Sequence, residues 1–358
     1  MGSLSIGDAK ASARALDDAL TRLHATDLEY RSRGSDGLSN HGPMAAETLE
    51  ALGATDKIGA FIDGYTDRLR PYASASGFDW AGRVQRLGDA TQGSAWVATV
   101  QAHLQAAAEP DARFGELVVE LLPGYVAAAM HGPLRAAHAW RAWGRHRSEA
   151  RARELAFGLA YWATRYQTLP GTPGALPQPG VGVLATLRAV PIVDPSRRND
   201  GLIFEQARVL DGDPAFAAVI ESIDLAAATP ERALTELASA GAKLYLRTPA
   251  ARFTYMHTLT GSVALRRLGS AIPAAAMPKA VGYGLQAVAA LLAINGAPAG
   301  WDAPWTQATA AKPEAITQAA IGSDDDHTIK FVEAALSEHA RTPRPEFLAA
   351  AAHRVGMR

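Results

Sequence analysis

The sequence predicts an all-α protein: a single large helical domain of about 12–14 helices with an internal loop rich in proline and glycine. Three observations lead to this prediction. Apolar residues recur at spacings of three and four in one segment after another, and alanine, the best helix former, makes up about a fifth of the chain. Patterns that favour β-strands are nearly absent.

The three- and four-residue spacing also places the helices in order along the chain. Several begin with residues that favour a helix N-terminus: Thr229 precedes Pro230, and Asp324 follows Gly322 and Ser323. The expected helices cover residues 8–24, 43–52, 56–69, 94–107, 111–130, 133–143, 146–166, 213–226, 230–246, 250–268, 278–294, 313–320, 324–340 and 345–355.

Residues 169–182, LPGTPGALPQPGVG, form the main break in the helical pattern, because their prolines and glycines cannot continue a helix. A second break follows at residues 295–305. The candidate site residues come from both sides of the first break, so we expect residues 1–358 to form one domain of two interlocked halves. Within residues 181–212, the segment VGVLATLRAVPIV fits either a short strand or irregular chain.

Composition excludes several classes of protein. The 358 residues carry 35 basic and 36 acidic side chains, and this balance gives no field that would attract nucleic acid or an anionic membrane. With no cysteine, the chain has no disulfides, thiolate metal sites or cysteine nucleophile. We find no apolar run of about 20 residues and no signal-peptide pattern at residues 1–10, so we expect a cytoplasmic protein without a membrane or nucleic-acid partner.

Motifs of common enzyme classes are also missing. The sequence has no Walker A loop, no G-x-S-x-G elbow, and neither the E-x-x-H nor the H-E-x-x-H metal pattern. Gly180, Gly182 and Ala185 match the G-x-G-x-x-A dinucleotide pattern, but they follow a proline-rich loop rather than a strand. Any metal must therefore be held by histidine, carboxylate or a rarer ligand.

Four of the ten histidines, at positions 41, 131, 257 and 327, have notable surroundings. His41 and His131 each precede Gly-Pro and an expected helix, which places them at helix N-termini. The helix dipole there disfavours imidazolium, so these histidines can stay neutral and bind a cation, although a plain turn role fits them too. His257 lies inside an apolar helix, where a buried ring needs hydrogen bonds or a metal at both nitrogens.

His327 and Lys330 lie at the start of another expected helix. The three aspartates of residues 324–326 can cap this helix and complement its dipole. Lys330 follows His327 on the same helix face. A lysine on an inward face must reach solvent, pair with an acid or change chemically, and an ion pair with one of the aspartates is the simplest of these.

The segments around these residues resemble the questin oxidase family. Residues 40–54, NHGPMAAETLEALGA, and 61–65, FIDGY, are similar to its N-terminal pattern. Residues 131–138, HGPLRAAH, 253–260, FTYMHTLT, and 326–330, DHTIK, are similar to its later histidine-centred blocks, in the same order. The similarity spans about residues 20–340 as scattered blocks, and the chain departs most from the family's pattern in the proline-rich break.

This resemblance implies a function and a site. The family consists of helical oxygenases that act on polycyclic aromatic polyketides such as anthraquinones, some by a Baeyer–Villiger-like ring opening. Some members hold a non-haem iron through four histidines and a carboxylated lysine. For this chain the resemblance implies an Fe(II)-dependent oxygenase whose partners are a small aromatic substrate and O2. The implied ligands are His41, His131, His257, His327 and carboxylated Lys330, with His138 in reserve for His131.

Two further expectations concern the substrate and the alternatives. Trp140 and Tyr255 offer aromatic surface for a substrate pocket, although aromatic residues at helical spacing also suit a core. A second enzymatic hypothesis is that the protein is a metal-independent oxidoreductase that uses NADPH. A non-catalytic α-helical scaffold that binds partners is the alternative outside enzymes.

Overall fold

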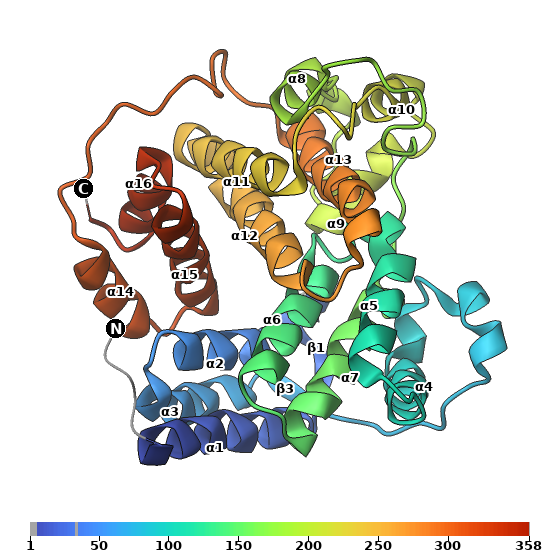
Figure 1. Ribbon diagram of the computed structural model, residues 1–358, viewed down its shortest axis with the longest axis vertical. Coiled ribbons are helices and arrows are strands. Elements are labelled where there is room, and N and C mark those ends of the chain that lie inside the picture. The colour runs from blue at the N-terminus through green and yellow to red at the C-terminus, as the bar shows by residue number, and fades with distance from the viewer. Residues whose placement is uncertain (1–5, 33–34, 358) are drawn as a thin grey trace.

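The helical periodicity of the sequence is borne out in the computed structural model, which describes residues 6–32 and 35–357 (Figure 1). Within those residues the chain forms 16 α-helices, so the all-α prediction is confirmed. The first half contributes α1 (Ile6–Leu23), α2 (Gly42–Ala51), α3 (Thr55–Thr66), α4 (Gly93–Gln105), α5 (Pro110–Leu121), α6 (His131–Arg145) and α7 (Glu149–Thr164). The second half contributes α8 (Val183–Ala189), α9 (Ile203–Gln206), α10 (Pro214–Glu221), α11 (Pro230–Arg247), α12 (Arg252–Leu268), α13 (Met277–Asn295), α14 (Pro313–Ile321), α15 (Asp326–Arg341) and α16 (Pro345–Arg354).

The expected helices differ from the observed ones in a few places. The helix expected over residues 111–130 stops at Leu121, because a 3-10 turn containing Pro123 follows and the chain then enters a left-handed conformation before His131. Helices α8 and α9 were not expected, since they are too short to show a clear apolar period. Residues 181–212 contain α8 and α9 and no strand.

A small sheet is the main feature that the sequence did not predict. Strands β1 (Thr26–Ser32), β2 (Ser35–Ser39) and β3 (Leu69–Pro71) pair antiparallel in the order β2-β1-β3. They are short and polar, and buried Leu28 of β1 gives little of the alternation that marks a strand. Directly after β2, the backbone N–H of Asn40 donates to the carbonyl of Leu28 at 3.0 Å, which fixes the start of α2.

The proline-rich break packs against the rest of the protein. Residues 165–182 form the connection between α7 and α8. The side-chain amide of Gln286, in α13, donates to the carbonyl oxygens of Pro170 and Gly171 at 2.9 and 2.8 Å. Among the described residues, the 22-residue helical stretch Ala274–Asn295 is long and apolar enough to cross a membrane, contrary to the expectation of no such run. It is mostly buried inside the protein, as a core helix would be.

The two halves of the chain share one hydrophobic core. Helix α12 packs against α11 of its own half and against α6 of the first half, and α15 packs against α2 (Figure 1). A smaller apolar cluster lies among α1, α2 and α3 and includes Ile329 of α15. The halves therefore meet along α2, α6, α12 and α15.

A buried ionic network joins these four helices. It consists of Glu47 of α2, His138 and Arg141 of α6, Arg267 of α12 and Glu333 of α15. The guanidinium of Arg141 lies 2.7 Å from the Glu47 carboxylate and 2.6 Å from that of Glu333. Glu333 also pairs with Arg267, and Glu47 accepts a hydrogen bond from His138 at 2.5 Å. Removing one partner of a buried pair leaves an uncompensated charge, so this network fixes the spacing of the helices.

A second buried ion pair joins α7 to α6. The Glu154 carboxylate accepts hydrogen bonds from Arg135 at 2.7 and 3.1 Å and lies 2.9 Å from Nε2 of His24. Burial alone would raise the pKa of Glu154. The charge of Arg135 and the hydrogen bonds outweigh burial and lower the pKa to about 2.

Acid should therefore destabilise the fold through Glu154. The folded pKa lies below the unfolded one, so this carboxylate contributes stability that is fully present above about pH 4.5 and lost as the pH falls toward 2. The contribution is about 3 kcal/mol. We expect Glu154→Gln, measured by urea unfolding between pH 7 and pH 2, to lose less stability on acidification than the wild type. Equal losses in the two proteins would contradict this account of Glu154.

Candidate functional site

Four helices bring four histidines together. His41 directly precedes the first residue of α2, His131 is the first residue of α6, His257 lies inside α12 and His327 is the second residue of α15. The ring centroid of His41 lies 4.6 Å from that of His131 and 4.5 Å from that of His327, and the centroids of His131 and His257 are 4.8 Å apart. These four side chains are called the histidine cluster below.

The spacing within the histidine cluster suits a metal ion. One ring nitrogen from each of His41, His131 and His327 can be chosen so that all three lie within 4.8 Å of one another. Nitrogens bound to one ion at about 2.1 Å can be at most about 4.2 Å apart, so small side-chain shifts would complete such a site. His257 adjoins this group through the His131 ring.

Asp326 orients two members of the histidine cluster. Its Oδ1 atom accepts a hydrogen bond from His41 Nδ1 at 2.5 Å and lies 3.0 Å from Nδ1 of His327. The same oxygen is 3.7 Å from Nζ of Lys330. Burial alone would raise the pKa of Asp326, but His41, His327 and Lys330 hold the pKa far below its usual range. Asp326 is therefore an anion that fixes the Nδ1 side of both rings.

Backbone carbonyls orient the other two members. Nδ1 of His131 donates to the carbonyl of Ala128 at 2.5 Å, and Nδ1 of His257 donates to the carbonyl of Phe253 at 3.0 Å. A carbonyl can only accept, so Nδ1 carries the proton in each ring and Nε2 keeps its lone pair. In all four rings the Nδ1 atom thus faces a protein oxygen, and Nε2 is the atom left to bind a ligand.

The Nε2 atom of His257 indicates what kind of ligand the histidine cluster suits. It is buried and has no hydrogen-bond partner among the described residues. A buried acceptor without a partner is costly and rare in folded proteins. A cation bound through this lone pair would satisfy it, so the donor set of the histidine cluster fits a metal ion.

His41, His131 and His257 are held in the neutral form that binds metals. Burial lowers the pKa of His41 to about 3, helped by the charge of Lys330, and burial also lowers the pKa of His257 to about 3. The pKa of His131 lies well below its usual range, mainly because of burial. The sequence suggested neutral rings at His41 and His131 because of the helix dipole, whereas in the structure burial is the larger cause.

Lys330 also faces the histidine cluster. Its side chain is buried, and burial lowers the pKa of its amine to about 8 despite the carboxylate of Asp326 nearby. The ion pair with an aspartate that the sequence suggested is therefore present, at 3.7 Å. Asp325, in contrast, caps α15 by accepting from the backbone N–H of His327 at 3.1 Å.

The turn before His131 has an unusual backbone. Ala128, Ala129 and Met130 have φ angles of 49°, 57° and 68°, the left-handed region that residues other than glycine rarely adopt. Each costs about 1–2 kcal/mol, and strain of this kind clusters at functional sites. The carbonyl that orients His131 belongs to this turn. Because none of its residues is glycine, this turn could not be predicted from the sequence.

The cavity beside the histidine cluster is small, and an aromatic ring borders the cluster on the solvent side. The cavity volume is about 10 Å³, room for one water-sized molecule. The ring of Phe253 is 59% exposed, and its centroid lies 5.2 Å from that of His327 and 5.5 Å from that of His257. The cavity is lined by His131, Leu134, Met256, His257, Thr260, His327, Lys330 and Phe331.

Three residues expected near the site lie elsewhere. His138 donates from Nδ1 to Glu47 within the ionic network, two turns from His131, so it is not the reserve ligand. The Trp140 ring stacks on Phe114 at 4.8 Å, and its indole N–H donates to a serine hydroxyl. Tyr255 is buried, and its hydroxyl donates to the carbonyl of Gly296. None of these side chains lines the cavity beside the histidines.

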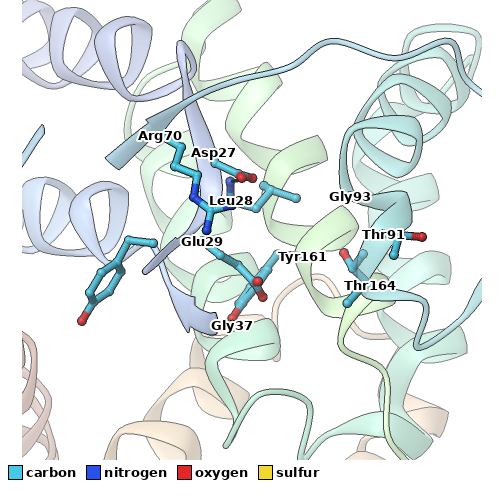
Figure 2. A pocket seen from close by; sticks show the side chains of 11 residues that line it. Asp27, Leu28, Glu29, Gly37, Arg70, Thr91, Gly93, Tyr161 and Thr164 are labelled. Atoms are coloured by element: carbon cyan, nitrogen blue, oxygen red, sulfur yellow. Dashed lines mark hydrogen bonds between the residues drawn. The ribbon is translucent and has the colours of Figure 1, made fainter. Parts of the chain in front are cut away.

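A larger cavity of about 340 Å³ lies between the sheet and helix α7. Figure 2 shows Asp27 and Glu29 of β1 and Arg70 of β3 on one side of it, and Tyr161 and Thr164 of α7 on the other. Glu29 is already paired with Arg165 at 2.5 Å. This cavity shares no lining residue with the one beside the histidines.

Comparison with known proteins gives no assignment for the chain. A scan of known protein families finds no match, and a search of curated proteins finds none either. The functional argument therefore depends on the geometry of the histidine cluster and on the residues that support it.

The hydrogen bonds predict the tautomer of the cluster histidines. In metal-free protein at pH 7, we expect His41, His131 and His257 to be neutral with the proton on Nδ1, because Nδ1 of each faces an oxygen acceptor. Long-range ¹H–¹⁵N spectra of ¹⁵N-histidine-labelled protein distinguish the two tautomers. Exposed His146 is an internal control, since it has no buried acceptor to fix its proton. An Nε2-protonated form at the three cluster positions would contradict the geometry.

Proposed function

We propose that the chain is an iron-dependent oxygenase that opens a ring of a polycyclic aromatic compound, with the histidine cluster as its metal site. One observation carries this proposal: four imidazoles converge with Nδ1 facing protein oxygens, which leaves Nε2 as the atom that can bind a metal. The resemblance to the questin oxidase family, which we propose as the relative of this chain, supports the same assignment.

The residues around the cluster suit Fe(II). Imidazole nitrogen is a good ligand for ferrous iron, and non-haem iron sites add an anionic oxygen ligand. Lys330 is the residue that could supply such a ligand, because its amine can react with CO2 to form a carbamate and release a proton. Asp326 would then act one step further out, orienting His41 and His327 through their Nδ1 atoms.

The protein's part in the reaction is to bind, orient and exclude water. When bound, Fe(II) supplies the one-electron chemistry that allows O2 to react with an electron-rich aromatic compound. The cavity beside the cluster has room for only one water-sized molecule, so a polycyclic substrate would approach from the open side. There the exposed ring of Phe253 can stack on it, while Leu134, Met256 and Phe331 shield the inner side from water.

The two alternative hypotheses, an NADPH-dependent oxidoreductase and a non-catalytic scaffold, gain no support from the structure. Gly180 and Gly182 lie in the loop between helices α7 and α8, so in the described part of the chain the element directly before them is a helix and not the strand that a dinucleotide-binding unit needs. Nothing in the loop therefore favours NADPH as a cofactor. If the protein is instead a scaffold without a metal, the metal analysis described next would reveal it.

Metal analysis tests the proposal. Protein purified without a histidine tag should contain about one equivalent of iron, whereas His257→Ala should lose it, because a ligand is removed while alanine suits a helix interior. The matched control is His146→Ala, which removes an exposed histidine and should keep the metal. Elemental analysis gives the iron content, and circular dichroism checks that helix content is unchanged.

Two results would contradict the metal site. One is wild-type protein that folds and stays metal-free after incubation with Fe(II) under anaerobic conditions. The other is His257→Ala protein with the same iron content as the wild type. A loaded protein that consumes no O2 with any anthraquinone or anthrone would leave the metal site in place but contradict the substrate class.

A further prediction concerns Lys330. If the lysine is carboxylated, Lys330→Ala should lose metal affinity, and acetate should partly restore it by filling the gap with a small carboxylate. Lys330→Arg should not be rescued, because arginine fills the space and keeps a positive charge. Wild-type protein should lose iron in CO2-free buffer and regain it with bicarbonate. Unaltered iron content in Lys330→Ala without any added acid would show that Lys330 only pairs with Asp326.

A further inference from the structure

The segment FIDGY, residues 61–65, lies near the end of α3 and places Tyr65 beside the histidine cluster. Ile58, Ile62 and Tyr65 follow one another at spacings of four and three, so they share one face of the helix, and all three are buried. This face packs into the small apolar cluster among α1, α2 and α3. The hydroxyl of Tyr65 accepts a hydrogen bond from the backbone N–H of His41 at 2.7 Å.

The position of this hydroxyl is fixed by close packing of its ring. A Cβ atom added to Gly42 would lie 3.0 Å from Cε1 of Tyr65 and 2.7 Å from Cδ2 of Leu23. Real Cβ atoms hardly ever make contacts this short, so glycine at residue 42 is what allows the two side chains to pack against the start of α2. The ring is therefore held between the apolar face of α3 and the backbone of α2.

The hydrogen bond from His41 to Tyr65 meets a need that the start of α2 creates. The first backbone N–H groups of a helix have no acceptor within the helix, and the side chain just before the helix commonly supplies one. His41 occupies that position, but its Nδ1 atom donates to Asp326 at 2.5 Å instead. Neighbouring side chains act as acceptors in its place: Asn40 Oδ1 accepts from the N–H of Gly42 at 3.1 Å, and Tyr65 accepts from that of His41.

We propose that Tyr65 is a positioning residue for His41, holding its backbone while Asp326 holds its ring. An imidazole fixed both at the backbone and at Nδ1 can present Nε2 in a single direction, which a metal ligand needs. Burial and the charge of Asp326 raise the pKa of Tyr65 well above its usual range, so the phenol stays neutral beside that carboxylate. The inference rests on the metal site proposed above and adds a residue that supports it without touching the ion.

Cobalt binding to the full chain tests this role. Tyr65→Phe keeps the ring and removes the hydroxyl alone. Co(II), followed by its visible absorption, should bind this variant about ten-fold more weakly than the wild type, since loss of a group that orients a metal ligand typically costs ten- to a hundred-fold in affinity. Tyr255→Phe is the matched control. It removes another buried hydroxyl that is bonded to the backbone, and it should keep the affinity of the wild type.

A second measurement needs no metal. In spectra of metal-free ¹⁵N-histidine-labelled protein, the His41 ring of the wild type should carry its proton on Nδ1. In Tyr65→Phe the ring is held less firmly against Asp326, so both tautomers should be visible. A hydroxyl that only stabilised the fold would change the urea midpoint and leave this signal as it is in the wild type.

The contrary results separate this role from the metal site. Equal Co(II) affinity of the wild type and Tyr65→Phe, or an unchanged His41 signal in the variant, would overturn the positioning role. An equal loss of affinity in Tyr255→Phe would overturn it as well, because the loss would then follow from stability. A wild type that binds no Co(II) would contradict the proposed metal site, and the metal-free spectra would still decide whether Tyr65 positions His41.

Discussion

The pairing of buried charges between α2, α6, α12 and α15 is the constraint on which the candidate site depends. Each of these helices presents one histidine to the cluster, and about two to three turns further along each presents a member of the ionic network. A helix that slid or rotated would leave a charge buried without its partner, which costs several kcal/mol. Asp326 holds side chains in place by the same kind of pairing at the cluster itself. One of its carboxylate oxygens contacts His41, His327 and Lys330. The position of the imidazoles thus follows from how the protein pairs its buried charges.

Much of the fold could be predicted from the sequence because its helices are long and regularly patterned. The features that were missed are short or depend on distant contacts. The strands around Leu28 carry almost no alternation, and α8 and α9 are too brief to show a period. The left-handed turn at residues 128–130 contains no glycine to reveal it. Helix α13 is apolar and mostly buried inside the protein. The apolar residues of a sequence segment do not show whether protein or lipid surrounds it.

The candidate site follows the same pattern. Features that depend on neighbouring residues could be predicted from the sequence, and contacts between residues far apart in the chain could not. Sequence context placed His41 and His131 at helix N-termini, and the structure shows both there. The sequence predicted that Asp326 caps the helix or pairs with Lys330, because nothing local shows that this carboxylate meets a histidine far away in the chain. Trp140 and Tyr255 were chosen for their aromatic character, yet each uses its polar atom on a neighbouring element. Tyr255 packs inside the core, and Trp140 is partly buried against it. The exposed ring beside the cluster is that of Phe253, whose position becomes clear only when α12 is packed against α15.

The central claim is that the free Nε2 atoms of the histidine cluster hold one metal ion. Anomalous diffraction tests this most directly, using crystals of tag-free protein loaded with Fe(II) and data collected on both sides of the iron absorption edge. The account predicts one strong anomalous peak within bonding distance of Nε2 of His41, His131, His257 and His327. Iron bound elsewhere, or cluster imidazoles whose Nε2 atoms are hydrogen-bonded to protein with no peak between them, would contradict it.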